Sequence, residues 1–333
     1  MNARNDSRGL RGERCNFIVA FSGAVLALLS AGCATYVTNS QAADFNRLVG
    51  TAATCFQVSI AEVRTMEADD AIDEFLARGG FKLEELAAQP RLKDDVAKAL
   101  NSQFEFLVCY SAALENLTSP STTWSSSVSA LNAKASKATA DAGALAAAGR
   151  PSLLSAADAQ KVGSELGSVA NALSTAGQAA ITLYGEDRGY QIAHSVDPFI
   201  QAYCSGLEDL LCRDPDSEPP ATGMAAILRA DYDERLATLR EVYAPMATKP
   251  SEPGYSSTFL DRRAVAAQYV ALQRNENDGV ARIVALRRVI SQIAAAHRAM
   301  AEKDDAGFKQ RIAATRDLIG SLSGGQPAVP SAK

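Results

Sequence analysis

Histidine is scarce in this chain of 333 residues, which contains only His194 and His297. A Ser-His-Asp hydrolase needs a histidine base that an acid orients beside the nucleophile, and the adjacency of Ser195 to His194 does not create that geometry. His297 falls within a periodic apolar pattern, which is typical of a core histidine with satisfied hydrogen bonds. The sequence therefore predicts no catalytic residue.

Patterns that bind metals or phosphates are also missing. No two cysteines have the CxxC spacing of zinc sites. The acidic cluster from Glu67 to Glu74 lacks the alternating ligands and central glycine of a helix–loop–helix calcium site, and it predicts the solvated start of a helix instead. The glycines between Gly163 and Gly177 have helical spacing. We expect no metal and no cofactor.

Aromatic residues make up only 6% of the chain, with a single tryptophan, and no basic patch offsets the formal net charge of −5. Without such a patch the chain cannot neutralise many phosphates, so nucleic acid is excluded as a partner. Hydrophobic residues reach 47%, and alanine supplies much of this fraction. Abundant Ala, Leu, Glu and Arg favour long, thin helical packing over a thick core.

The chain begins with a basic segment followed by an apolar one. Arg4, Arg8, Arg11 and Arg14 precede the apolar run Phe17–Leu29, and small residues follow. This order is typical of a secretory signal peptide. The apolar segment is shorter than the roughly 20 residues of a spanning helix. An uncleaved signal anchor and a plain secreted leader remain the alternatives.

The segment Leu29-Ser30-Ala31-Gly32-Cys33 resembles the lipobox of bacterial lipoproteins. The resemblance covers residues 1–33 only. It implies that Cys33 receives a diacylglycerol on sulfur, that the bond before it is cut, and that two or three acyl chains then hold the protein on a membrane. Ala34, where an aspartate would favour the inner membrane, implies an outer-membrane location on the periplasmic side.

The cysteines divide into three groups. Cys15 leaves with the leader and Cys33 takes the lipid, so four cysteines remain in the mature chain: Cys55, Cys109, Cys204 and Cys212. An even number in an oxidising compartment predicts two disulfides. Three pairings are possible, and proximity favours 55–109 with 204–212. The second pair needs a turn, because eight helical residues span about 12 Å and a disulfide bridges Cα atoms within about 7 Å.

Apolar residues recur at helical spacing along most of the mature chain, and no convincing strand pattern appears. Residues 121–148 are either a loose Ala/Ser helix or a partly disordered linker. Glu186–Tyr190 is either a hinge loop or an ion-pair network within a helical region. The other predicted helices are Ala42–Met66, Ala71–Ala77, Lys82–Ala88, Arg91–Leu117, a segment from Ala156 to Ile181, Val196–Leu211 and Thr222–Met246.

The C-terminal region has the clearest pattern. Two interleaved heptad series run along one predicted helix: Val265, Leu272, Gly279, Leu286, Ile293 and Met300, and Tyr269, Glu276, Ile283, Ile290 and His297. The polar segment Asn275–Gly279 predicts a kink or a solvent contact. A turn at Lys303–Gly307 should return the chain, so that Phe308, Ile312, Thr315 and Ile319 pack along the same seam.

These features predict an all-α protein, an elongated up-and-down helical bundle with a long C-terminal coiled-coil-like helical hairpin. We divide it into a cleaved signal peptide (1–32), a lipidated tether (33–40), an N-terminal helical region (41–214), a C-terminal hairpin region in the same bundle (215–323) and a disordered tail (324–333).

The function predicted from the sequence is that of a lipid-anchored component of the cell envelope that binds or scaffolds another envelope protein. One alternative is a pore-forming or lysis-type protein, since residues 121–183 are rich in Ala, Gly and Ser. Another is a cell-wall-directed enzyme that uses paired carboxylates. A row of arginines on the long helix is either a solvated flank or a contact for anionic lipid or an acidic partner: Arg262, Arg263, Arg274, Arg282, Arg287 and Arg288.

Overall fold

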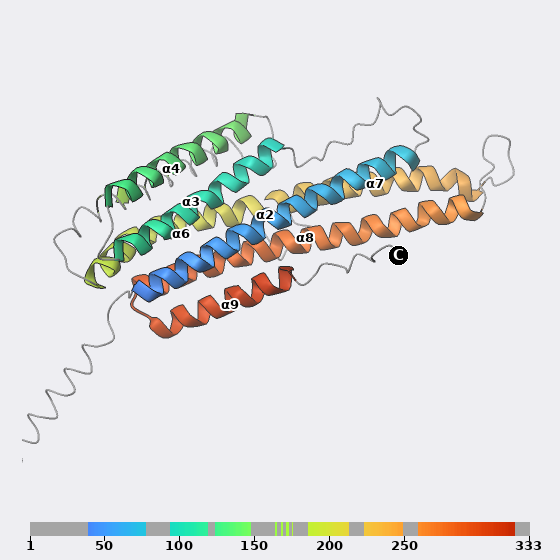
Figure 1. Cartoon of the computed structure of the whole chain (residues 1–333). Helices are drawn as coiled ribbons and strands as arrows, with labels where there is room; N and C mark the ends of the chain where they lie inside the picture. The colour runs from blue at the N-terminus through green and yellow to red at the C-terminus, as the bar shows by residue number, and fades with distance from the viewer. Residues whose placement is uncertain are drawn as a thin grey trace, which may run out of the picture.

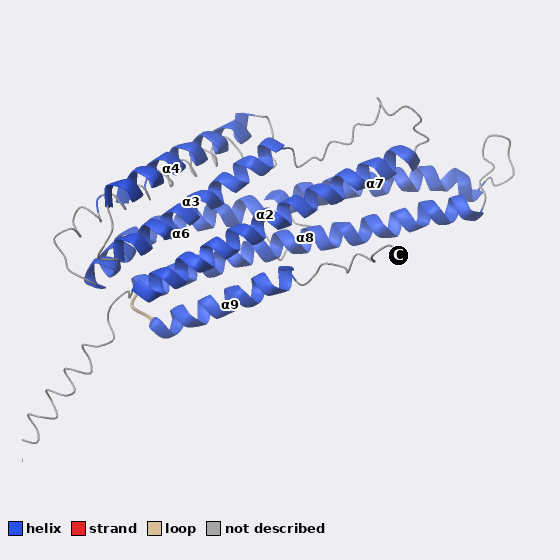
Figure 2. Cartoon of the chain, in the orientation of Figure 1, coloured by secondary structure: helices blue, strands red, loops and turns tan. Residues whose placement is uncertain are grey.

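The computed structural model describes residues 39–77, 94–118, 124–147, 186–212, 223–248 and 259–323, together with residues 164, 168, 171, 172 and 175. Within these residues every regular element is a helix (Figures 1 and 2). The prediction of an all-α helical bundle is therefore confirmed. The helices are α2 (Asn39–Ala77), α3 (Asp94–Thr118), α4 (Trp124–Ala147), α6 (Glu186–Leu211), α7 (Gly223–Thr248), α8 (Phe259–Ala301) and α9 (Asp305–Ser323).

Helix α8 is the spine of the bundle. Helices α2, α6, α7 and α9 all pack directly against it, whereas α3 joins through α2 and α6 and carries α4 on its outer side (Figure 1). The expected heptad stripe explains this position, because it buries Leu272, Ile283, Leu286, Ile290 and Ile293 to 2% exposure or less. The stripe gives α8 apolar contacts along most of its length.

Helix α8 continues without a break through Asn275–Gly279, and the expected solvent contact is confirmed, because Asn277 and Asp278 are exposed. Glu276 is buried and pairs with Arg229 of α7 at 3.4 Å. A Cβ atom at Gly279 would lie 2.8 Å from Leu228 Cδ2, so glycine allows α7 to approach closely at this point. Neighbouring groups on α7 thus supply the partners that sequence periodicity alone could not show.

The turn between α8 and α9 is confirmed, and it brings three helices together at one end of the bundle. Lys303 adopts a left-handed φ of 62°, and the Asp304 side chain accepts a hydrogen bond from the Gly307 amide at 2.9 Å. The Lys303 ammonium lies 4.0 Å from the centre of the Tyr190 ring on α6. Gln41, near the start of α2, donates a hydrogen bond to Asp305 at 2.8 Å.

Two N-terminal expectations need correction. Helix α2 is continuous from Asn39 to Ala77, so the expected break near Glu67–Asp70 is absent and the acidic cluster lies inside the helix. Residues 67–77 include several good helix formers and contain no Gly or Pro, which explains the continuity. Helix α2 also begins within the expected tether 33–40. Residues 1–38, the predicted helix Lys82–Ala88 and the tail 324–333 lie outside the described residues.

The middle of the chain settles one alternative and corrects another. Residues 124–147 form helix α4, so the helical alternative for 121–148 is correct. Glu186–Tyr190 is the first part of α6, so the hinge-loop alternative is wrong; the side chains of residues 186–188, on which the ion-pair alternative depends, lie outside the described residues. The predicted helix from Ala156 to Ile181 lies outside the described residues except at residues 164, 168, 171, 172 and 175, which are helical.

We expect that Gly223→Ala lowers the free energy of unfolding by roughly 1–3 kcal/mol. Gly223 begins α7 with a φ of 81°, and a Cβ there would lie 3.0 Å from the carbonyl oxygens of Asp209 and Leu210. Urea titration of purified protein measures this loss. The control is Gly320→Ala, which meets no atom within 4 Å and should raise stability by about 0.5–1 kcal/mol. A Gly223→Ala variant as stable as the wild type would contradict the assignment.

Candidate functional site

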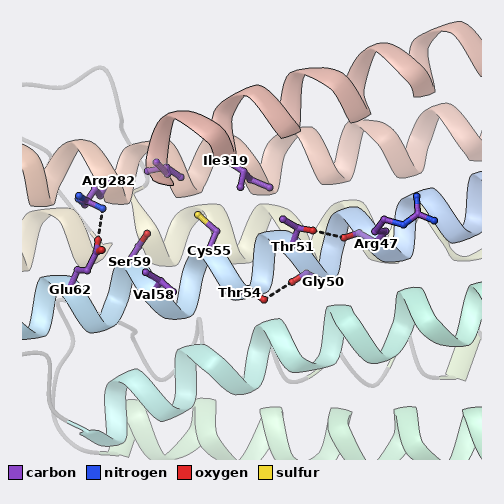
Figure 3. Close-up of a pocket in the computed structure, with 11 residues that line it drawn as sticks. Arg47, Gly50, Thr51, Thr54, Cys55, Val58, Ser59, Glu62, Arg282 and Ile319 are labelled. Atoms are coloured by element: carbon purple, nitrogen blue, oxygen red, sulfur yellow. Dashed lines mark hydrogen bonds and ion pairs between the residues drawn. The ribbon is translucent and has the colours of Figure 1, made fainter. Parts of the chain in front are cut away.

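A groove of about 560 Å³ runs along α2 beside the C-terminal part of α9 (Figure 3). Helix α8 contributes Arg282, and α9 contributes Ile319 and Leu322. The lining from α2 forms one helical face, because its members recur every three or four residues: Arg47, Gly50, Thr51, Thr54, Cys55, Val58, Ser59 and Glu62.

Small side chains make the groove concave. Thr51 donates its hydroxyl hydrogen to the Arg47 carbonyl at 2.8 Å, and Thr54 donates to the Gly50 carbonyl at 3.1 Å. Both hydroxyl donors are therefore used within α2, so these threonines present methyl groups and acceptor lone pairs to the groove. Val58 is 50% exposed and adds apolar surface to the floor.

An arginine lies at each end of the groove. Arg282 donates from Nη1 to Glu62 Oε2, and Arg47 donates from Nη1 to Asp44 Oδ1 at 2.8 Å. The side chain of Arg47 is 68% exposed, whereas that of Arg282 is 18% exposed. The groove thus combines a small, weakly apolar floor with charged ends. This arrangement suits an elongated amphipathic ligand better than a compact substrate.

Cys55 lies in the groove floor, but its environment does not activate it. Burial raises the pKa of the Cys55 thiol, and the Ser59 hydrogen bond and the nearby Arg282 charge only partly oppose this rise. The thiolate is the nucleophilic form, so Cys55 is a poor nucleophile at neutral pH.

The predicted disulfides are absent: Cys55, Cys109, Cys204 and Cys212 are all thiols in the structure. Cys55 faces the groove between α2, α8 and α9, whereas Cys109 on α3 lies near Lys134 of α4. Cys204 and Cys212 are held apart by helix, because the Cys212 amide still donates to the Glu208 carbonyl at 2.9 Å. The turn that a 204–212 bridge requires does not occur.

A buried polar network joins α3, α6 and α8. His297 of α8 is fully buried, with Nδ1 2.7 Å from Asp197 Oδ1 on α6 and Nε2 2.6 Å from the Tyr110 hydroxyl on α3. Phe45 of α2 contacts the imidazole edge to face at a centroid distance of 5.7 Å. The prediction that His297 is a satisfied core residue is therefore confirmed.

The hydrogen-bond direction in this network follows from its members. A carboxylate only accepts, so the imidazole Nδ1 carries the proton shared with Asp197; when the imidazole is neutral, Nε2 accepts the hydroxyl proton of Tyr110. Burial, and then the Asp197 charge, raise the pKa of Tyr110 well above its usual range, which keeps this donor protonated. The order acid–histidine–hydroxyl matches a hydrolase triad, but Tyr110 is completely buried and no substrate can reach it.

A second groove, of about 600 Å³, lies between α6, α8 and α9, and the described residues that line it include three carboxylates. Glu208 pairs with Arg287 at 3.2 Å, and Asp304 accepts the Gly307 amide proton. Burial raises the pKa of Glu208, although the Arg287 charge opposes the rise. Two of the three carboxylates in this groove therefore have structural partners, and the geometry provides no positioned acid–base pair.

Sequence reasoning missed the groove and two members of the buried network. The groove residues on α2 have ordinary surface character, and only the position of α9 makes them concave. Tyr110 and Asp197 are 187 and 100 residues from His297. No local pattern marks such distant partners, although the placement of His297 in an apolar heptad implied that it had some.

No protein-family model, curated protein or solved structure matches this chain. The described residues include no group of three side chains that could hold a metal ion. No helix among the described residues is both long enough and apolar enough to cross a membrane.

Asp197 should make stability fall in acid. Burial raises its pKa, but the His297, Gln201 and Arg298 contacts outweigh burial, so the folded pKa lies below the ordinary value of 3.8. The carboxylate therefore stabilises the fold above its unfolded pKa, and this contribution is lost as the pH falls through the folded pKa. Between about pH 6 and about pH 3, urea titrations should show a shallower fall for Asp197→Asn than for the wild type.

The control for this pH series is Asp317→Asn, since Asp317 is exposed on α9. This variant should follow the wild-type pH dependence. An Asp197→Asn variant with the wild-type pH slope would show that the carboxylate is not selectively stabilised in the folded state.

Thiol reactivity should separate the four cysteines into two pairs. Cys204 and Cys212 are fully buried, and burial raises the pKa of Cys204, so neither should react with Ellman's reagent before unfolding. Cys55 and Cys109 are half-buried and should react slowly in the native state. The measurement uses unreduced protein. The variants Cys55→Ser and Cys109→Ser show which cysteine gives each slow reaction. Failure to recover four thiols after denaturation would restore the disulfide prediction.

Proposed function

We propose that this protein is a lipid-anchored component of the bacterial cell envelope that binds another envelope protein and holds it in place without catalysis. The lipid attaches at Cys33, and the bundle stands on the periplasmic side of the outer membrane. The basic start, the apolar run and the Leu29–Cys33 pattern support the anchor. Helix α2 begins at Asn39, so the tether between lipid and bundle is short.

The amphipathic groove along α2 is the observation that carries the binding role. Its polar side chains contact other groups of the protein: both arginines have carboxylate partners, and the Thr51 hydroxyl donates a hydrogen bond within its own helix. Such a surface offers shape, apolar contact and charge at its ends. These are the properties by which grooves recognise amphipathic segments of other proteins.

The anchor is tested by Cys33→Ala in the native host. We expect the wild type to incorporate labelled palmitate and to float with outer-membrane fractions. The variant should lose the label and should be processed differently, because the lipidated cysteine sets the cleavage point. Labelling of the variant to the wild-type level, or membrane association unchanged after the substitution, would contradict anchoring through Cys33.

The binding role is tested by placing a photo-crosslinking amino acid at Val58 in intact cells. Val58 is exposed in the groove, and Thr65 is an exposed control on the same helix outside it. We expect one defined envelope protein to crosslink from position 58 and not from position 65. Substituting Arg47→Glu should weaken that crosslink. Equal products from both positions, or only abundant outer-membrane proteins, would contradict a specific groove.

One observation favours a membrane-active role as a second candidate. Among the side chains of α4 that the structure describes, the buried apolar ones are one leucine and three alanines: Leu131, Ala135, Ala138 and Ala142. Among the described helices its packing partner is α3. A helix held by so little apolar surface could separate and lie on a lipid surface.

Liposome leakage distinguishes the two candidates. A membrane-active protein should release trapped dye, and a disulfide between cysteines at positions 103 and 138 should stop the release. These positions are in contact, since Gln103 donates to the Ala138 carbonyl at 2.8 Å. A scaffold should cause no leakage with or without the disulfide.

A further inference from the structure

The far end of the α7–α8 hairpin is the part of the described bundle most distant from the start of α2 (Figure 1). Helix α8 has 43 residues, so at 1.5 Å per residue its two ends are about 65 Å apart. The Ala301 end lies beside the beginning of α2, where Gln41 contacts Asp305. The Phe259 end, which we call the tip, therefore points away from the tether.

A mainly apolar groove of about 380 Å³ opens at this tip between α7 and α8. None of the α2 side chains that the structure describes lines it, and α2 packs on both helices. Val270 is 46% exposed and Tyr243 is 38% exposed, so both offer apolar surface to a ligand in the groove. The lining residues are Leu239, Arg240, Tyr243, Val265, Ala266, Tyr269 and Val270.

Arg240 and Tyr269 fix the shape of this groove. The Arg240 guanidinium carbon lies 5.2 Å from the centre of the Tyr269 ring, and Nε donates to the Tyr269 hydroxyl at 3.0 Å. The contact joins α7 to α8 and holds a planar cation in an exposed position. It uses no carboxylate, so the charge of Arg240 remains available to an acidic group.

Arginines also mark both ends of the apolar stripe that α8 contributes. Arg263, Ala266, Val270 and Arg274 are spaced three, four and four residues apart, so they share one face over about 16 Å. Within the described residues neither Arg263 nor Arg274 has a carboxylate partner.

The paired arginines lie nearer the middle of the bundle. Arg229, Arg282 and Arg287 contact Glu276, Glu62 and Glu208 respectively. Around the tip groove, Arg240, Arg263 and Arg274 thus have no carboxylate partner among the residues that the structure describes, although the net charge of the chain is −5.

We propose that the tip binds an amphipathic α-helix of a partner protein, about three turns long, with an apolar centre and acidic ends. Two antiparallel helices with an apolar groove between them provide the position that a third helix fills in a bundle. Arg263 and Arg274 would each face an acidic group at one end of the partner helix. Arg240 would face the side of that helix that lies against α7. This inference rests on the proposed scaffold function, since it names the chemistry of one partner.

A second copy of the chain fits the tip poorly. A two-fold contact would bring Arg240, Arg263 and Arg274 of one copy near the same arginines of the other, and like charges that meet in an interface oppose association. An acidic partner avoids this repulsion and gains from steering by the positive tip.

The test uses full-length protein in detergent micelles and two fluorescent synthetic helices. Both helices carry the same leucine face, but one has glutamates at its ends and flanks, and the other has lysines. Fluorescence anisotropy should show binding of the glutamate helix, with affinity that falls as salt rises, and at least about tenfold weaker binding of the lysine helix.

Three variants locate the binding surface. Arg263→Glu and Arg274→Glu should each weaken the glutamate helix by several-fold, and together by at least about tenfold. Arg288→Glu is the matched control, because Arg288 is exposed on α8 outside this groove and its reversal should have little effect. Circular dichroism verifies that all three variants fold.

Several results would overturn the proposal. Equal binding of both synthetic helices, no binding of either, or equal loss in Arg288→Glu would each exclude an acidic helix at the tip. Concentration-dependent dimerisation that Arg263→Glu abolishes would identify a second copy as the occupant instead. The peptide assay does not involve the lipid anchor or the α2 groove, so its failure would leave the proposed scaffold function standing.

Discussion

Burial of one stripe on α8 holds the bundle together. The stripe contacts four other helices, and at His297 it reaches a fifth, α3, through the Tyr110 hydroxyl. Hydrophobic contact along this stripe is non-directional, so it brings the helices together without fixing their register. The Asp197–His297–Tyr110 hydrogen bonds are directional and buried, and breaking one would leave an unsatisfied polar group in the core. The apolar stripe thus provides cohesion, while the polar network favours one alignment of α3, α6 and α8.

The fold was largely predictable because its dominant signal is periodic and local. The heptad series on α8 and the return helix with Phe308, Ile312 and Ile319 follow directly from residue spacing. Prediction failed where a distant neighbour altered a local signal. Asn275–Gly279 suggested a kink. In the structure Arg229 of α7 pairs with the buried Glu276, and Leu228 of α7 packs against Gly279. The disulfide prediction failed for a related reason. It rested on the even number of cysteines and on an oxidising compartment, and neither shows that Cys55 and Cys109 lie on different sides of the α2–α3 pair.

The α2 groove could not have been predicted from sequence, since its concavity depends on Ile319 and Leu322 of α9. The tip was partly visible as a row of arginines on the long helix. The structure divides that row into members with carboxylate partners, such as Arg282 and Arg287, and members that have none among the described residues, such as Arg263 and Arg274. A charged residue can bind a partner when its charge is not paired with a neighbouring side chain. Whether it is paired is visible only when helices distant in sequence are placed side by side.

The antiparallel packing of α2 against α8 has a mechanical consequence. Tension between the start of α2 and the far end of the α7–α8 hairpin would act along the helix axes and slide α2 past α8 (Figure 1). Such sliding must disrupt many side-chain contacts at once, including the Arg282–Glu62 ion pair, whereas peeling would break them one after another. The bundle is therefore oriented to resist stretching between its two ends, in the manner of a lap joint.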